Sequence, residues 1–256
     1  MITWTDYPID NSSGDARQAL IDSGRRQLRE QGSLCLPDFI SGKTLQRLLD
    51  EVARLKNSGH RMSGLYPATS DDLSAAGDLS LPAAHRFIAG DLLDSDSPAR
   101  QIYEHAGLLG FIADLFELPQ LYRVADTMGC INYLIYQPGD SNGWHFDSTD
   151  FVVSLCLQLA EQGGSYETIP DFRSNCDGNT AAVAQRMLNP EDSTGVKSVD
   201  LSVGSLFLFK GRNSMHRVTE VKGTQDRIML ILSFHRQPGH YLSQGSRLAM
   251  YGRAGD

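Results

Sequence analysis

The sequence predicts a mainly β fold, in which a jelly-roll core follows a mostly helical N-terminal half. From about residue 120 onward, short apolar or alternating segments recur at regular spacing between Gly, Asn, Asp and Pro turn signals, which is typical of sandwiches and jelly rolls. Before that point, apolar residues recur at helical spacing. We expect a single domain over 1–256, with a mostly helical part over 1–120 and the β core over 121–240.

Helices are expected over about 15–31, from Ser41 onward and over 98–117. Ser41 is a favourable N-cap residue. The apolar face of the second helix would be formed by Leu45, Leu48, Leu49, Val52 and Leu55. Core candidates in the third helix are Ile102, Leu108, Leu109, Ile112 and Leu115.

Two polar segments and one short strand complete the N-terminal half and the middle of the chain. SLCLPDFI (33–40) is expected to form a strand that Pro37 ends. Residues 57–84 are rich in Ser, Asp, Gly and Ala and predict a long loop, of the kind that often acts as a lid. Residues 171–195 are polar and irregular, with a possible helix at 180–188.

Six strands are expected in the β core, each bounded by turn residues. They lie within the segments 127–140, 151–159, 163–170, 196–201, 204–211 and 216–221, and a seventh apolar strand follows at 227–235.

Charge and composition narrow the function. The formal net charge of -8 argues against nucleic acid as a partner, because phosphate binders usually carry a basic surface. One buried arginine would still suffice for a small anionic ligand.

No apolar run approaches the ~18 residues of a membrane span. The first twenty residues do not resemble a secretory signal, and four scattered cysteines without a CxxC indicate reduced thiols. We therefore expect a cytoplasmic protein without a membrane partner.

His145 and Asp147 form an H-x-D triplet directly after the turn sequence PGDSNG (138–143). In an extended chain, residues i and i+2 project to the same side. One imidazole and one carboxylate can therefore converge on one cation. The triplet alone is weak evidence, because a surface histidine beside a strand-capping aspartate gives the same pattern.

His216 and Arg227 make the pattern more specific. His216 begins a strand, and Arg227 begins the next apolar strand, RIMLILSFH. Two histidines and one carboxylate form the facial triad of non-haem iron(II) oxygenases and leave metal positions open. An arginine that enters a buried strand needs an anionic partner. That partner is either a ligand carboxylate, which matches the guanidinium fork, or an Asp or Glu of the chain.

The order and spacing of these residues resemble the Fe(II)/2-oxoglutarate-dependent oxygenase superfamily over residues 120–237. The resemblance implies a double-stranded β-helix core flanked by α-helices. It implies that His145, Asp147 and His216 hold Fe(II) and that Arg227 pairs with the distal carboxylate of 2-oxoglutarate. The implied reaction consumes O₂, hydroxylates an unactivated C–H bond and releases succinate and CO₂.

Two segments, GWHFD (143–147) and GSLFLFKGRNSMHRVTEV (204–221), look similar to the free-amino-acid radical halogenase and hydroxylase group, which includes lysine chlorinases. Halogenases of that group carry Gly or Ala in place of the carboxylate ligand, which frees a position for halide. Here that residue is Asp147, so the resemblance implies a hydroxylase. Ser148 and Met128 stand where we expect the acidic residues that bind the substrate ammonium in the lysine enzymes.

Further site candidates come from strand alternation and from neighbouring turns. Asn132 and Tyr136 share one face of the strand before the triplet, with Tyr133 on the other, and are candidates for binding the cosubstrate. Candidates for contact with the substrate are Arg86 with its neighbour His85, Ser148, and Arg212. For Arg86 and His85, a surface charge and a polar helix position are an equally good explanation, and for Arg212 a solvated turn is the default.

Two alternative functions share these residues. One is a cupin-like metalloenzyme or metal-binding module that does not use 2-oxoglutarate, and Arg227 argues against it. The other is a non-catalytic sensor or binding domain, and the intact ligand set argues against that. The favoured substrate is a small polar metabolite, such as an amino acid or a biosynthetic intermediate, and a nucleoside-type metabolite stays possible. The sequence does not indicate an oligomeric state.

Overall fold

The computed structural model describes residues 7–10, 14–67, 80–174 and 177–255. Most strands of the described part belong to one antiparallel sheet. They are β1 (Ser33–Leu36), β2 (His60–Pro67), β3 (Ser80–Ala89), β5 (Ile131–Tyr136), β6 (Asn142–His145), β7 (Val152–Gln158), β9 (Tyr166–Ile169), β10 (Lys197–Val199), β11 (Leu206–Phe209), β12 (Met215–Val218) and β14 (Arg227–Leu232). Two small sheets pair β13 (Val221–Lys222) with β8 (Gln162–Gly163) and β15 (Phe234–His235) with β4 (Tyr122–Arg123).

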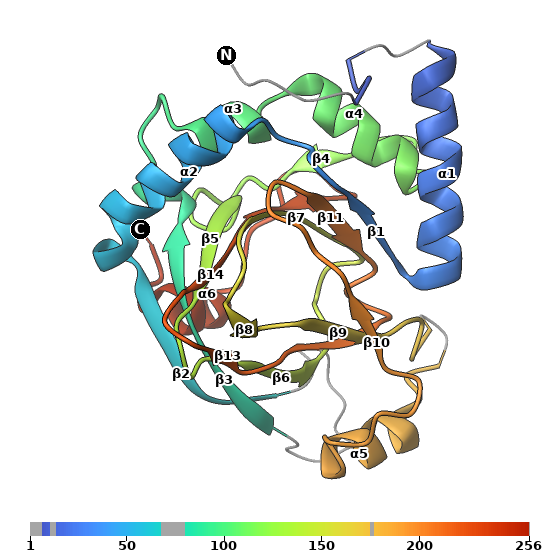
Figure 1. The fold of residues 1–256 in the computed structure, drawn as a ribbon, viewed down its shortest axis with the longest axis vertical. Coiled ribbons are helices and arrows are strands. Elements are labelled where there is room, and N and C mark those ends of the chain that lie inside the picture. The colour runs from blue at the N-terminus through green and yellow to red at the C-terminus, as the bar shows by residue number, and fades with distance from the viewer. Residues whose placement is uncertain (1–6, 11–13, 68–79, 175–176, 256) are drawn as a thin grey trace.

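The main sheet curls into two facing walls, which confirms the predicted jelly-roll core (Figure 1). The larger wall has the strand order β1-β11-β7-β14-β5-β3, with β2 beside β3. The smaller wall continues as β6-β12-β9-β10. The strands of the larger wall are buried almost throughout, because one face meets the interior of the core and helices cover the other.

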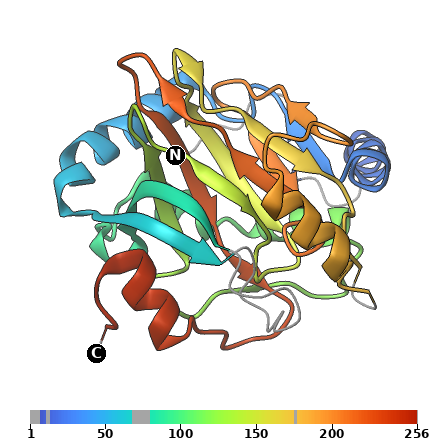
Figure 2. The same cartoon turned by 90° about the horizontal axis from the view of Figure 1, so that it is seen from below.

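Helices flank both walls. They are α1 (Asp15–Gln31), α2 (Gly42–Leu55), α3 (Pro98–Tyr103), α4 (Ala106–Leu115), α5 (Thr180–Leu188) and α6 (Gln244–Tyr251), with single 3₁₀ turns η1 (Lys56–Ser58) and η2 (Gly90–Leu92). The first four pack on the outer face of the larger wall and share its largest apolar core. Figure 2 shows α6 beside β2 and β3, and α5 at the smaller wall. Among the described helices, none is long and apolar enough to cross a membrane.

The helix predictions hold with one difference. The Ser41 hydroxyl caps α2 by accepting a hydrogen bond from the Thr44 amide at 3.3 Å, and the possible helix at 180–188 is α5. The single helix expected over 98–117 is divided into α3 and α4. His105 has an extended backbone there and caps α4, because its Nδ1 accepts from the Leu108 amide at 3.3 Å.

The loop predicted over 57–84 is wrong for most of its described residues. Residues 60–67 form β2 and residues 80–84 begin β3, while 68–79 lie outside the described residues. The two strands pair from His60 opposite Phe87 to Pro67 opposite Ser80, and β3 then pairs with β5. Their Ser, Gly and Ala content gives no strand signal, since tertiary pairing rather than propensity stabilises them. The N-terminal part therefore contributes β1, β2 and β3 to the sheet.

Candidate metal centre and its cavity

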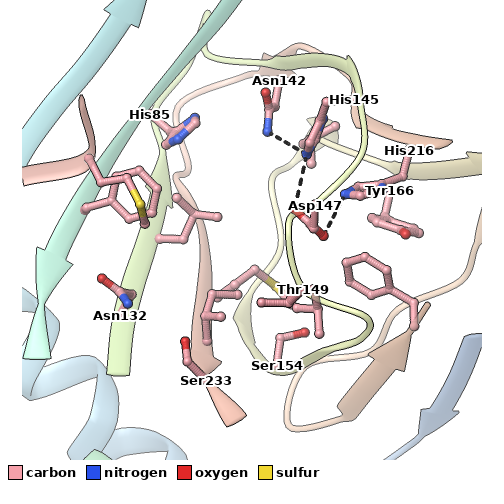
Figure 3. Close-up of a pocket in the computed structure, with 18 of the residues that line it drawn as sticks. His85, Asn132, Asn142, His145, Asp147, Thr149, Ser154, Tyr166, His216 and Ser233 are labelled. Carbon is pink, nitrogen blue, oxygen red and sulfur yellow. Dashed lines mark hydrogen bonds and ion pairs between the residues drawn. The ribbon is translucent and has the colours of Figure 1, made fainter. Parts of the chain in front are cut away.

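Two paired strands of the smaller wall bring the predicted metal ligands together. His145 ends β6, Asp147 lies two residues further on, and His216 on β12 stands directly opposite His145. The Nε2 atom of His216 lies 3.2 Å from Asp147 Oδ2, and that of His145 lies 3.8 Å from Oδ1. The three potential ligand atoms lie within 4.8 Å of one another (Figure 3). Of the residues described, no other group of His, Cys, Asp or Glu meets this condition.

Backbone carbonyls fix the orientation of both imidazoles. His145 Nδ1 lies 2.7 Å from the Gly143 carbonyl oxygen, and His216 Nδ1 lies 2.9 Å from that of Ser214. A carbonyl only accepts, so each Nδ1 carries the proton and each Nε2 keeps a free lone pair. This is the usual arrangement of a histidine that ligates a metal through Nε2.

The protonation states also suit a cation. Burial, followed by the nearby His216, lowers the pKa of His145 to about 4. Burial would raise the pKa of Asp147, but the two neighbouring histidines more than offset it and hold that pKa below its ordinary value. A neutral imidazole and an ionised carboxylate are therefore present at neutral pH, and this donor set suits Fe(II).

Gly211 allows the carboxylate to reach this position. Its carbonyl accepts the Asp147 amide at 3.1 Å. A Cβ on Gly211 would lie 2.5 Å from Asp147 Oδ2 and 2.9 Å from Asp147 Cβ, so any larger residue would displace the carboxylate. The same Oδ2 is buried without a well-aligned hydrogen-bond donor, which leaves it free for a metal ion.

A cavity of about 290 Å³ between the two walls is lined by the three candidate metal ligands, His145, Asp147 and His216, and by Arg227. Arg227 begins β14 opposite Tyr136 and is only 3% exposed, with its guanidinium 5.4 Å from the Tyr136 ring centre. No acceptor within the described ranges bonds its Nε, and no carboxylate pairs with it. Burial lowers the pKa of this guanidinium. A buried, unpaired cation is costly, so the site fits an anionic ligand.

The structure brings Asn132, Tyr136 and Ser148 to the cavity lining. Tyr133 faces the opposite way, as alternation predicts, and donates to Glu51 at 2.6 Å. Arg86 does not line the cavity, because β3 turns its side chain outward to donate to the Gly59 carbonyl at 2.6 Å.

Arg212 is also absent from the cavity lining. Its Nε donates to Asp150 at 3.0 Å, and its guanidinium also bonds the Ser148 carbonyl. This turn residue therefore supports the loop that carries Ser148 rather than pointing into the cavity.

Several cavity residues were missed by sequence reasoning. They are Asn142, Thr149, Ser154 and Tyr166. Gly211, which packs against Asp147, was missed as well. His85, considered only as a companion of Arg86, also lines the cavity, and burial lowers its pKa to about 4. Assigning 80–89 as a strand would have placed His85 inward, since Ala83, His85 and Phe87 alternate with outward residues.

Comparisons with known proteins agree with this geometry. The family model described as halogenase D matches residues 16–243. The structure is similar to the non-haem α-ketoglutarate-dependent carbocyclase SnoK from nogalamycin biosynthesis (TM-score 0.61, 14% identity, 93% of this chain and 94% of that one). It is also similar to a 2OG-Fe(II) oxygenase family protein from Burkholderia pseudomallei, with a TM-score of 0.54 and 17% identity over 86% of this chain and 92% of that one. A Pseudomonas putida prolyl-4-hydroxylase matches with a TM-score of 0.53 and 14% identity over 85% of this chain and 99% of that one. The comparison with curated proteins gave no match.

These structural relatives share the fold, with identities too low to transfer a substrate. The family match spans most of the sequence, including His145, Asp147, His216 and Arg227. The chain therefore belongs to the halogenase D family and has the fold of the 2-oxoglutarate- and iron(II)-dependent oxygenases.

Proposed function

We propose that the protein is an Fe(II)- and 2-oxoglutarate-dependent dioxygenase that hydroxylates an unactivated C–H bond of a small organic molecule. One oxygen atom of O₂ enters the product and the other enters succinate, and CO₂ leaves. The observation that carries the proposal is Arg227, a buried guanidinium without a counter-ion that shares its cavity with the His-Asp-His cluster.

The side chains fit the implied groups. His145, Asp147 and His216 would hold iron(II) and leave three positions of an octahedral ion open. Arg227 would pair with the distal carboxylate of 2-oxoglutarate in bidentate fashion, and Tyr136 packs beside its guanidinium. When bound, iron and 2-oxoglutarate supply the activation of O₂ and the oxidation of the C–H bond. The protein orients the ligands and excludes water from the cavity.

Asp147 supports hydroxylation rather than halogenation. A halide needs a metal position that no protein carboxylate occupies, and the Asp147 carboxylate lies beside both histidines. Gly211 leaves just enough room for it. We therefore propose a hydroxylase within a family named for halogenation.

The proposed substrate is a small molecule and not a nucleic acid. The cavity is small, at about 290 Å³, and it lies between the two walls. The net charge of -8 disfavours a phosphate backbone.

The test is an anaerobic titration of the metal-free protein with Fe(II) and 2-oxoglutarate, monitored by the weak visible absorption of the chelate. We expect a band in the wild type, no band in His216→Ala, and a much higher 2-oxoglutarate requirement in Arg227→Met. The matched control is Arg86→Gln, whose side chain lies outside the cavity. Folded wild-type protein without a band would contradict the proposal.

A second measurement separates the alternatives. Under air, the reconstituted protein should convert 2-oxoglutarate to succinate slowly without substrate, and added chloride should have no effect. Metal binding without any 2-oxoglutarate dependence would instead favour the cupin-like alternative.

A further inference from the structure

The larger wall presents its cavity-facing side chains in ordered rows, because β3, β5, β14 and β7 pair in register. Each row crosses neighbouring strands. The first consists of Tyr136, Arg227 and His85, whose ring centre lies 5.1 Å from that of Tyr136. The second is Phe87, Leu134 and Met229, and the third is Asn132, Ile231 and Ser154. The first row is polar, the second is apolar, and the third carries amide and hydroxyl groups. Figure 3 shows His85 and Asn132 well apart along this wall.

The first row contains more polar capacity than 2-oxoglutarate needs. Arg227 and His85 are separated by the strand of Tyr136, which places them roughly 10 Å apart. A carboxylate on Arg227 therefore leaves His85 without a partner. The His85 side chain is buried, and its Nδ1 has no hydrogen-bond partner. A neutral imidazole offers one donor and one acceptor, and leaving the buried Nδ1 unused is unfavourable.

The third row lies roughly 13 Å along β5 from Tyr136, since a strand rises about 3.3 Å per residue. Here the Asn132 amide donates through Nδ2 to the Gly129 carbonyl at 3.2 Å. That bond fixes the orientation of the amide. Its buried Oδ1 has no well-aligned donor. The neighbouring Tyr251 hydroxyl interacts with the same amide, so at least one of the two Oδ1 lone pairs stays available. Ser154, on the far side of Ile231 in the same row, donates to the Phe207 carbonyl at 3.2 Å. Asn132 thus offers a neutral acceptor to a ligand.

Between these two positions, the wall is apolar. Phe87, Leu134 and Met229 face the cavity from three neighbouring strands. Within the described lining, the formally charged groups at neutral pH are Asp147 and Arg227. Asp147 is assigned to the metal and Arg227 to the cosubstrate. A substrate ammonium or carboxylate would lose its hydration here without gaining a counter-ion, which is strongly unfavourable.

On the basis of the proposed function, we propose that the cavity binds an uncharged substrate, with an apolar segment between hydrogen-bonding groups such as amides or hydroxyls. His85 and Asn132 are the specificity-determining residues for these groups. Asn132 accepts a hydrogen bond from a substrate N–H or O–H, and His85 bonds the other polar group. The hydrocarbon between them lies along the Phe87, Leu134 and Met229 row, facing the metal. This substrate class differs from the free amino acids.

The test uses matched probes with one carbon skeleton in ionised and neutral form. They are L-leucine with N-acetyl-L-leucinamide, and L-proline with N-acetyl-L-prolinamide. Binding is measured anaerobically as the change that each probe causes in the Fe(II)–2-oxoglutarate absorption band, and turnover as succinate formed above the probe-free rate. We expect a neutral probe to bind at least roughly tenfold more tightly than its ionised partner, as unpaired charge burial requires.

Variants then assign the preference to the two residues. His85→Phe and Asn132→Leu should each lower the affinity for the neutral probe by roughly tenfold, which is the contribution of one hydrogen bond to a buried group. His85→Gln should restore part of the affinity. Asn132→Asp should shift the preference to the cation L-leucinamide, and Arg86→Gln should leave all probe affinities unchanged.

The outcomes separate this inference from the proposed function. No absorption band in the wild type refutes the proposed function. A normal band with equal or tighter binding of the ionised probes, or with no response to any probe, overturns the neutral substrate class. A neutral preference that survives both His85→Phe and Asn132→Leu overturns the assignment of these residues.

Discussion

The two faces of the central strand β5 differ in how their polar side chains are hydrogen-bonded. On the helix side of β5, the Tyr133 hydroxyl donates to Glu51 Oε2 at 2.6 Å, and the same oxygen accepts from Ser97 at 2.9 Å. On the cavity side, Tyr136 lies under the guanidinium of Arg227, whose Nε is unpaired. Burial raises the pKa of both tyrosines, that of Tyr136 to about 12. The helix side completes its own hydrogen bonds, whereas the cavity side leaves them open.

The difference extends beyond one strand. Nine buried side-chain atoms of the described residues lack a hydrogen-bond partner, and five of them belong to cavity-lining residues. These five residues are His85, Asn132, Asp147, Tyr166 and Arg227. Unsatisfied buried groups destabilise a protein. Their concentration around one cavity indicates that ligands complete them, so stability and function are assigned to opposite faces of the larger wall.

The largest expected effect on the cavity side comes from His145→Ala. Removing one of three ligands should abolish iron binding and reduce 2-oxoglutarate turnover to background. The fold should persist, since the helix-side core is untouched. Metal content after dialysis and the far-ultraviolet circular dichroism spectrum check both halves of the prediction. Unfolding of this variant would contradict the separation of the two faces.

Leu230→Ala is the matching change on the helix side. Leu230 is fully buried on β14 opposite Tyr133 and packs in the largest apolar core. We expect the free energy of unfolding to fall by about 2–5 kcal/mol, measured by urea denaturation. The Kd for metal in the folded fraction should not change. A large change in metal affinity with little loss of stability would reverse the comparison.

Gly211→Ala should act on the metal site through a single methyl group. Its Cβ would collide with the Asp147 carboxylate, so metal affinity should fall by about 10–100-fold. The control is Gly42→Ala at the start of α2, where a Cβ meets nothing within 4 Å. That substitution should leave metal binding unchanged. Equal metal affinities for both variants would show that Gly211 does not limit the position of Asp147.

Phe variants of the two tyrosines of β5 should separate the effects of its helix side and its cavity side. Tyr133→Phe removes a hydrogen bond from the buried Glu51 and should reduce the free energy of unfolding by about 1–3 kcal/mol. Tyr136→Phe should change stability by less than about 0.5 kcal/mol and should instead raise the Kd for 2-oxoglutarate. Denaturation and anaerobic titration measure the two effects. The comparison fails if both variants lose the same stability.

Local spacing made the metal ligands predictable, whereas tertiary pairing decided the rest of the site. The H-x-D triplet requires only strand periodicity, and Arg227 is conspicuous because a charge enters an apolar strand. The choice between His85 and Arg86 depends on assigning 80–89 as a strand, and its proline and alanine residues give no such signal. The direction of Arg212 depends on Asp150, which is distant in sequence.

The smallest predicted effect concerns Asp126, which anchors the segment carrying Leu242 at the cavity edge. Its carboxylate accepts from the Leu242 amide at 3.0 Å and from Arg247 Nε at 2.8 Å, and it also accepts from the Met128 and Gly129 amides. Burial alone would raise the pKa of Asp126, but these hydrogen bonds hold it below the ordinary 3.8. Its contribution to stability is therefore present above that value and is lost as pH falls through the lowered pKa.

Asp126→Asn should therefore destabilise the protein by about 1–2 kcal/mol at neutral pH. The difference from the wild type should shrink as the pH falls below about 4, because the wild-type carboxylate then becomes protonated as well. Urea denaturation of both proteins from neutral pH to below about 4 measures this difference in the free energy of unfolding. A difference that stays constant with pH would mean that the shape of the side chain, rather than its charge, holds Leu242 at the cavity edge.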